Sequence, residues 1–295
     1  MKKLLFLAAT TALALSSCSD NEITSMVQTG KTPVKIDVYS QGQTRVTETV
    51  LQTLQNNGFK LQVTNSDGGV ELDATATYAT ATGWSYGSNI YWPYDETKPL
   101  TFCAIYPESE IADGNTQIEL DGATDVVAAY TSTTMPTGGQ VSLSFGHILS
   151  QLAIYARGNN DDFTYSVTQV EVMAPAEMVY SFESGVAEYL DDAPVDYLTS
   201  ATGVSAPYST TTYTDLNTAH AIVAAKEVEI SVSYTVTRKS DTTDTQNYTK
   251  SARVVTQKGM KHNVNLTLPC DRTPVTITVS VNPWENAADT DKTVS

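Results

Sequence analysis

Three histidines and two adjacent pairs of acids are the residues of this chain best suited to acid–base or metal chemistry. His147, His220 and His262 fall in separate strand-like stretches, and no nucleophile is evident beside them. The acid pairs at residues 161–162 and 191–192 lack the spaced oxygen ligands of a dedicated calcium loop. Zinc-protease and phosphate-loop motifs are also missing from the sequence. We therefore predict no catalytic, cofactor-binding or metal site, and we do not expect an enzyme.

The best-defined chemistry concerns the thiol of Cys18. Two lysines open the sequence, an apolar run covers residues 4–15, and two serines precede the cysteine. A basic start, a short apolar run and small residues make a secretory signal peptide. The run is shorter than the ~20 residues that a membrane-spanning helix needs. We predict a signal peptide over residues 1–17 and acylation of Cys18, as in bacterial lipoproteins. An incidental cysteine in an ordinary signal peptide is the alternative.

The polar residues after Cys18 indicate where such a lipoprotein would be displayed. Residues 19–22 read SDNE and resemble the short acidic export signal of surface lipoproteins, although a solvated linker has a similar composition. We expect a lipidated linker over residues 18–32 and an outer-membrane lipoprotein that is exposed at the cell surface. No other long apolar run occurs, so the N-terminal lipid is the membrane attachment that we predict.

Charge and cysteine content narrow the choice of partners. The chain of 295 residues has 33 Asp and Glu against 17 Lys and Arg, for a formal net charge of -16. So acidic a chain repels nucleic acid, which is therefore not an expected partner. Beyond Cys18 the chain contains Cys103 and Cys270, without a CxxC pattern. We expect two buried free thiols rather than a disulfide or a zinc site.

Apolar and polar residues alternate with a period of two through most of the chain, which is the pattern of β-strands. Clear examples are VKIDVY at 34–39, FKLQV at 59–63, VSLSF at 141–145, VEISVSYTV at 228–236 and VTITVSV at 275–281. Turn-forming clusters divide these runs. The helical signal is weak, and residues 47–56 predict only a turn of helix or a loop. The sequence therefore indicates an all-β protein.

A polar interval, RGNNDD at residues 157–162, interrupts the strand pattern near the middle of the chain. The strand-like runs before it are enough for one β-sandwich, and similar material follows. We predict two tandem antiparallel β-sandwich domains, at residues 33–158 and 159–295.

Four short motifs follow one another in a defined order. They are IYWP at 90–93, LTFCAIYP at 100–107, VSLSFGHILSQL at 141–152, and a last strand that ends in Trp284. With the lipoprotein signal, this order resembles the fimbrillin-like family of type V pilus subunits over the whole chain. Ile105 departs from that family's usual aromatic residue. The resemblance implies transthyretin-like sandwiches and a structural role in a cell-surface pilus, or fimbria.

The aromatic residues of these motifs predict buried anchors, and the prolines predict strand ends. The anchors are Tyr91, Trp92, Phe102, Tyr106 and Phe145, and the prolines are Pro93 and Pro107. His147 lies in phase with the apolar residues before it. We expect a satisfied core histidine there rather than a metal ligand or a catalytic base.

The resemblance also implies a proteolytic site. In pilus-forming members an Arg-specific protease cuts after an arginine in a Thr-Arg-Ala-Thr-like context. Here QTRVT at residues 43–47 places Arg45 at that point, with Val46 in place of alanine. Cleavage between Arg45 and Val46 would remove the first predicted strand, at residues 33–40, together with the lipid. The alternative is an ordinary solvated arginine in a loop.

A sandwich that loses a strand exposes unpaired edges and an apolar slot, which a strand from another subunit can fill. We therefore expect a structural or adhesive pilus subunit that assembles with other subunits by donor-strand exchange. The run at 275–281 is either the donor strand or the last internal strand. The alternative function is a permanently lipid-anchored surface protein, either a pilus anchor or tip component or a module that binds a glycan or host protein. Its candidate binding residues, which hairpin packing also explains, are Tyr78, Trp84, Tyr86 and Tyr94.

Overall fold

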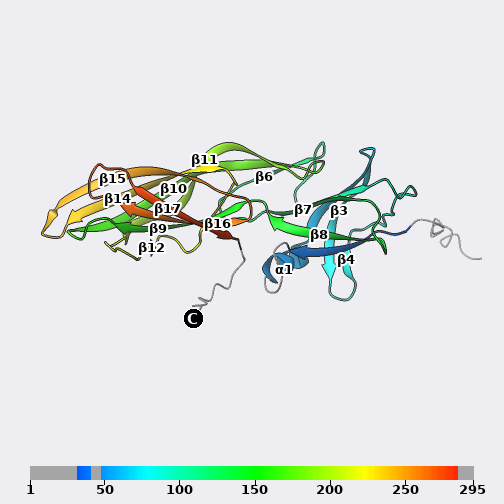
Figure 1. Ribbon diagram of the computed structural model, residues 1–295, viewed down its shortest axis with the longest axis horizontal. Helices are drawn as coiled ribbons and strands as arrows, with labels where there is room; N and C mark the ends of the chain where they lie inside the picture. Colours follow the sequence, from blue (N-terminus) through cyan, green and yellow to red (C-terminus); the bar gives the residue numbers. More distant parts are fainter. Residues whose placement is uncertain (1–31, 41–47, 285–295) are drawn as a thin grey trace, which may run out of the picture.

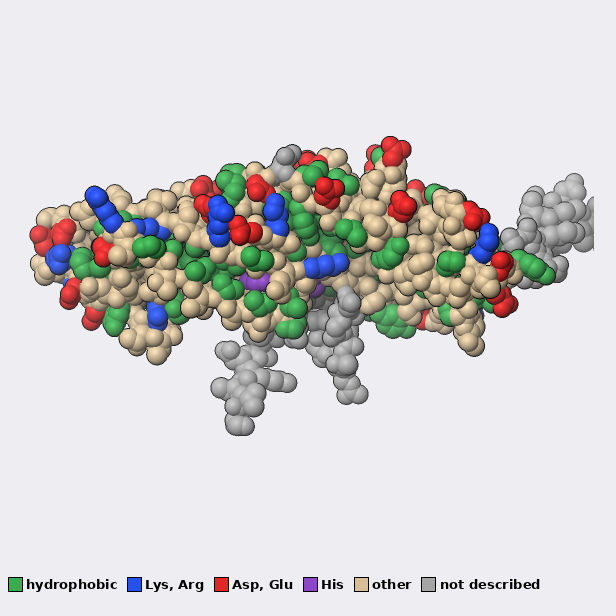
Figure 2. All heavy atoms as spheres, turned by 45° about the horizontal axis from the view of Figure 1, so that its top comes forward, with side chains coloured by type: hydrophobic (Ala, Val, Ile, Leu, Met, Phe, Trp, Pro, Cys, Tyr) green, Lys and Arg blue, Asp and Glu red, His purple; other side chains and the backbone are tan. Residues whose placement is uncertain are grey.

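The computed structural model describes residues 32–40 and 48–284, which form two groups of strands at opposite ends of an elongated molecule (Figure 1). The described residues contain seventeen strands and one helix, so the expected all-β class is confirmed. Within this part of the chain, no helix has both the length and the apolar character needed to cross a bilayer. On the face shown in Figure 2, acidic and basic side chains are interspersed rather than segregated.

The first group is a seven-stranded sheet in the order β1-β8-β7-β5-β2-β3-β4. Its strands are β1 (Lys35–Ser40), β2 (Phe59–Asn65), β3 (Val70–Ala79), β4 (Gly83–Ser85), β5 (Leu100–Tyr106), β7 (Val127–Thr133) and β8 (Gln140–His147). Alternate side chains of these strands point into one core. Trp92, Phe102 and Phe145 are buried in it as expected, whereas Tyr106 packs half-buried at its margin and Tyr91 is half-buried. The motif aromatics therefore fill the first core or border it.

One full helix, α1 (Glu48–Asn57), replaces the turn or loop expected at residues 47–56. Val50 and Leu54 of α1 are buried in the first core, which stabilises a helix whose own propensity is weak. Gly58 ends the helix with a positive φ of 79°, and its N–H donates to the Leu54 carbonyl at 2.8 Å. The local pattern underestimated this element because the packing that stabilises it comes from distant strands.

The second group consists of two five-stranded sheets that enclose another core. One sheet contains β6 (Asn115–Glu119), β10 (Phe163–Ser181), β11 (Ala187–Ser205), β14 (Glu227–Arg238) and β15 (Asp241–Val255). The other contains β9 (Ser150–Gly158), β12 (Thr214–Asp215), β13 (Ala221–Val223), β16 (Met260–Leu268) and β17 (Thr276–Pro283). β15 and β17 are edge strands of these two sheets.

Two strand pairs correct the expectation of purely antiparallel sheets. β1 runs parallel to β8, and β9 runs parallel to β16. Strands joined by a tight turn must be antiparallel, but a long connection allows a strand to return in the same direction. Both parallel pairs join strands that lie far apart in the sequence, and an alternating pattern carries no information about direction.

The two groups share a third cluster of buried residues, which joins them. It contains Cys103 and Ile105 of β5, Ile118 of β6, Tyr180 of β10 and Trp284, the residue after β17. β6, although early in the sequence, pairs with β10 of the second group. β9 also packs in the second core, although the expected domain limit at residues 158–159 assigns it to the first domain. Two strands that the predicted limit assigns to the first domain, β6 and β9, therefore pair with strands of the second group.

Candidate functional site: the β1 seat

β1 occupies one edge of the seven-stranded sheet, and β8 is its neighbour there. The two strands pair in parallel register from Lys35 opposite Gln140 to Ser40 opposite Phe145. We call the surroundings of β1 the β1 seat. It consists of the β8 edge, the part of the first core beneath β1, and residues 86–92. An edge strand is the part of a sheet that can leave with the least disruption of the other pairs.

Alternate side chains of the β1 segment fill the core below it. Val34 and Val38 are only 4% and 8% exposed, and Ile36 packs against the same cluster. Each buried valine contributes roughly 1.5–3 kcal/mol through its removal from water. The opposite face carries Lys35 and Tyr39, which are exposed. The seat therefore recognises a pattern of apolar residues at every second position.

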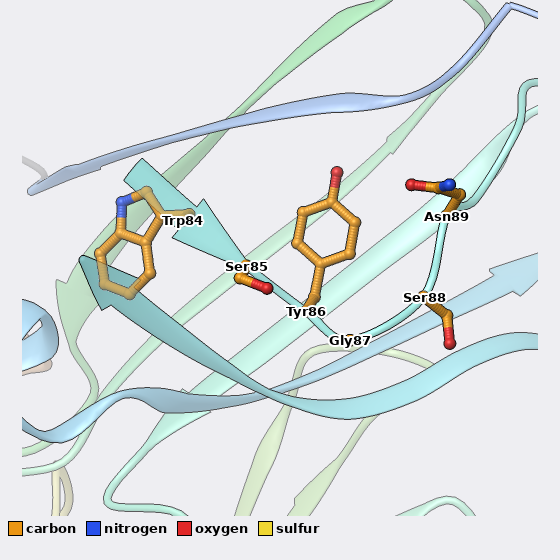
Figure 3. A pocket seen from close by; sticks show the side chains of 6 residues that line it. All are labelled: Trp84, Ser85, Tyr86, Gly87, Ser88 and Asn89. Atoms are coloured by element: carbon orange, nitrogen blue, oxygen red, sulfur yellow. The ribbon is translucent and has the colours of Figure 1, made fainter. Parts of the chain in front are cut away.

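The start of the β1 segment is held by hydrogen bonds to three residues, Tyr86, Ile90 and Trp92, which we call the start bracket. The Val34 N–H donates to the Ile90 carbonyl at 3.0 Å, and the Trp92 N–H donates to the Thr32 carbonyl at 2.9 Å. The Tyr86 hydroxyl donates to the Val34 carbonyl at 3.0 Å. Figure 3 shows the Tyr86 ring standing beside the pocket formed by its neighbours in the chain. Burial raises the pKa of Tyr86, so its hydroxyl keeps its proton at neutral pH.

Gly139 connects the start bracket with β8. Its carbonyl accepts the Lys35 N–H at 3.1 Å and the Trp92 indole N–H at 2.9 Å. The residue has φ of 71°, and a Cβ there would lie 2.8 Å from the Thr32 side chain. A glycine is therefore required where β1 and the turn before β8 approach each other.

The pocket beside Tyr86 is small and polar. It has a volume of about 260 Å³ and is lined by residues 84–89. Residues 83–87 read GWSYG, which has the GxSxG spacing of hydrolase nucleophiles. In such enzymes the serine lies on a sharp turn between a strand and a helix. Ser85 instead ends β4, a largely half-buried strand that is followed by a bend, and none of the pocket residues is a histidine. The spacing therefore does not indicate catalysis here.

The four aromatic residues considered for ligand binding mostly pack against the protein. Trp84 lies 4.9 Å from the Phe59 ring and 5.2 Å from the Tyr78 ring, and Tyr86 belongs to the start bracket. Tyr94 differs because its side chain is 88% exposed. Hairpin packing thus explains Tyr78 and Trp84, and the hydrogen bond to Val34 explains Tyr86.

His147 has specific partners that the sequence did not indicate. Its Nδ1 lies 2.7 Å from a carboxylate oxygen of Asp125, and its ring stacks on Trp284 at 4.1 Å. The backbone N–H of Trp284 donates to the Gly259 carbonyl at 2.9 Å, and the backbone N–H of Gly259 donates to the Leu149 carbonyl at 2.9 Å. The His147 motif and the closing tryptophan therefore meet in the cluster that joins the two groups of strands.

The other two histidines, His220 and His262, have surroundings that differ from those of His147 and from each other. His220 Nε2 is 3.6 Å from Asp215, whereas His262 is buried on β16. Among the described residues, no group of three or more His, Cys, Asp or Glu could hold a metal ion. The acids of the predicted surface pairs lie near lysines, with Asp161 2.7 Å from Lys239 and Asp192 3.0 Å from Lys226.

Both cysteines within the described ranges are free thiols, as expected. Cys103 is buried in the cluster that joins the two groups, 3.8 Å from the Tyr180 hydroxyl, and burial raises its pKa to about 12. Cys270 is half-buried. The predicted lipidation site Cys18 and the predicted cleavage site between Arg45 and Val46 lie outside the described residues and stay predictions.

Comparison with known proteins identifies the family. The chain matches the fimbrillin-like family over residues 26–284. It is 24% identical to the fimbrium subunit Fim1C of Phocaeicola vulgatus, and the match covers 99% of this chain and 98% of that protein. A crystal structure of a fimbrial protein from Bacteroides vulgatus superposes with a TM-score of 0.61 at 18% identity, over 85% of this chain and 99% of that one. This chain therefore belongs to the fimbrillin-like family.

Proposed function

We propose that the chain is a structural subunit of a cell-surface fimbria, which joins other subunits by exchanging the strand in the β1 seat. Membership of the fimbrillin-like family, and a relative named as a fimbrium subunit, support a structural rather than an enzymatic role. In finer detail, we interpret the two groups of strands as tandem transthyretin-like sandwiches. The two opposed sheets of the second group and the core between them support this interpretation.

The position of β1 carries the proposal. β1 is an edge strand, and its last residue, Ser40, precedes Arg45 in the sequence. A cut after Arg45 would leave β1 attached to the body only by hydrogen bonds and apolar contacts. The body would then expose the free edge of β8 and the apolar places vacated by Val34 and Val38. A free edge above an apolar slot binds another extended strand.

The N-terminal lipid gives this cut a role in assembly. Acylation of Cys18 delivers the precursor to the outer membrane, with the β1 seat filled by its own strand. Cleavage between Arg45 and Val46 releases the body from the lipid and opens the seat at the same time. A strand from another subunit fills the seat, and because such contacts run head to tail, a filament grows. The expected partners are therefore other pilus subunits, and the expected location is the surface-exposed fimbria.

Limited proteolysis of the purified precursor tests this step. An Arg-specific protease should make one cut, after Arg45, and the body should then form a ladder of polymers. Arg45→Ala should abolish both results, while Arg253→Ala, at a side chain that is 68% exposed, serves as a matched control that leaves both unchanged. Cuts scattered over the arginines of the body would contradict the proposal.

The alternative is a permanently lipid-anchored protein that serves as a pilus anchor or tip, or that binds a glycan or host protein. The exposed ring of Tyr94 is the side chain that such a binding surface would use. This alternative predicts that cells retain the full-length lipoprotein, and that Arg45→Ala changes neither its amount nor the number of fibres.

A further inference from the structure

A fully buried histidine lies in the second core. Among the side chains that the structure describes, His262 is the one histidine, lysine, arginine or acid that is buried, with 0% exposure. It lies on β16 in phase with Val264 and Leu266, whose side chains belong to the second core. Because alternate residues of a strand share a face, the imidazole of His262 points between the two sheets of this group.

The imidazole lacks the hydrogen bonds that the fold supplies to other buried polar groups. The Ser150 hydroxyl donates to the Gln257 carbonyl at 2.6 Å. The Thr256 hydroxyl donates to the Ala224 carbonyl at 2.7 Å. For His262, neither ring nitrogen has a hydrogen-bond partner of good geometry in the described part of the chain. A buried polar atom without a partner destabilises a fold, so this position is a weak point that the rest of the core must offset.

The strands beside His262 offer no counter-ion for a protonated ring. Leu152 of β9 and Val281 of β17 lie opposite His262 in the two neighbouring strands. β17 carries no charged residue along residues 276–283. The other titratable residues of β9 and β16 are Tyr155, Arg157 and Lys261. They alternate with buried residues and so lie on the outer face, and none of them is an acid.

The sheet across the core offers no carboxylate to the ring either. The acids of its strands β10 and β14 are Glu171, Glu177, Glu227 and Glu229. Each of them precedes a buried apolar residue, which places the acid on the outer face. Two of them, Glu227 and Glu229, bind the exposed Arg253 there. A proton added to His262 would therefore put an uncompensated charge into the second core.

The other two histidines differ in this respect. His147 lies 2.7 Å from a carboxylate oxygen of Asp125, and His220 lies 3.6 Å from Asp215. A proton added to either ring meets a negative charge, so acid does not disturb these positions in the same way.

The shortest way for a charged His262 to reach water is past β17. β17 is the edge strand beside β16 (Figure 1). Its apolar side chains cover the core poorly, since Val279 and Val281 are 42% and 43% exposed. Separation of β17 from β16 would hydrate the ring without disturbing the other strand pairs of the sheet.

We propose that His262 is an acid switch in the second group of strands, whose protonation parts β17 from β16 and opens that side of the core. Burial lowers the pKa of His262 from its ordinary value of 6.5, and the nearby backbone of Met260 and Gln151 opposes this only in part. The unfolded chain therefore takes up the proton more readily. The stability that the neutral ring provides is complete above pH 6.5 and is lost as the pH falls below that value. The switch acts in the uncleaved chain, so it stands or fails independently of strand exchange.

Hydrogen exchange of the full-length protein, followed by mass spectrometry, locates the opening. Exchange is compared at about pH 7.5 and about pH 5, the range over which histidine changes charge, after correction for the intrinsic effect of pH. Peptides from β16 and β17 should exchange several-fold faster at the lower pH. Peptides from β2 and β5 of the first group are the internal control and should not change. Equal protection of β16 and β17 at both values would overturn the proposal.

Variants assign the response to His262. His262→Leu places an apolar side chain in the apolar core, so it should raise the urea midpoint at neutral pH and remove the acid response. His262→Gln keeps a polar side chain that cannot take up a proton, so it should remove the acid response without the gain in stability. His220→Gln and His147→Gln are matched controls that should keep the response.

Each outcome bears on the proposal. An acid response that persists in both His262 variants, or that disappears in His220→Gln or His147→Gln instead, would overturn it. If neither His262 variant folds, hydrogen exchange of the unmodified protein still decides whether acid opens β16 and β17.

Discussion

The imidazole of His147 stacks on the indole of Trp284, with ring centroids 4.1 Å apart and planes inclined by 15°. His147 ends β8, the strand that pairs with β1, and Trp284 follows β17, the last strand of the second group. The contact between these two rings therefore links the β1 seat with the end of β17.

Trp284→Ala should destabilise the protein by about 3 kcal/mol, because it removes a large buried side chain and leaves a cavity. Trp284 is 7% exposed and also loses its stack on His147. Urea unfolding measures the effect. Tyr94→Ala is the control, since an 88% exposed ring should change stability by no more than ~0.5 kcal/mol. Equal effects of the two changes would contradict the assigned packing.

Tyr86→Phe should loosen β1 without unfolding the body. The change removes the hydrogen bond from the hydroxyl to the Val34 carbonyl, which is worth about 1 kcal/mol. Hydrogen exchange of the β1 amides should speed up several-fold in the uncleaved precursor. Tyr39→Phe is a suitable control, because that hydroxyl contacts the exposed side chain of Asp37. Unchanged exchange in Tyr86→Phe would remove Tyr86 from the start bracket.

Val38→Ala should weaken the hold of the seat on β1. Val38 is 8% exposed, and its truncation should cost about 2 kcal/mol. After cleavage, the segment that contains β1 should leave the body faster, which size-exclusion chromatography can follow. Lys35→Ala, on the exposed face of the same strand, should leave the rate unchanged. Faster release from the lysine variant than from the valine variant would reverse the assigned faces of β1.

The Cys103 thiol should resist alkylation in the folded protein, because it is buried and its pKa is raised to about 12. The pKa of the Cys103 thiol is higher in the folded protein than in the unfolded chain, so folding favours the neutral thiol. The contribution of the neutral thiol to the free energy of unfolding is therefore complete below the unfolded pKa of about 9. That contribution is lost as pH rises from 9 towards 12. Iodoacetamide labelling with mass spectrometry should find Cys270 modified well before Cys103. Rapid native labelling of Cys103 would contradict its burial.

Local sequence patterns predicted the strands of this fold because alternation is a local property. They predicted neither the parallel pairing of β1 with β8 nor the full length of α1, since both depend on residues distant in the chain. The partner of His147 was also missed, because Asp125 lies on a separate segment and the two residues meet only after folding.

The β1 site was predictable in part. The first strand and the arginine after it could be identified from the sequence. The residues that hold this strand could not be identified, because the contacts of Val34 with the start bracket depend on residues 86–92.

The central claim is that β1 leaves the subunit before polymerisation. Mass spectrometry of the N-terminus of subunits in purified fibres tests it most directly. The account predicts that assembled subunits begin at Val46 and carry no lipid. Fibres whose subunits begin at an acylated Cys18 and retain residues 32–40 would contradict it.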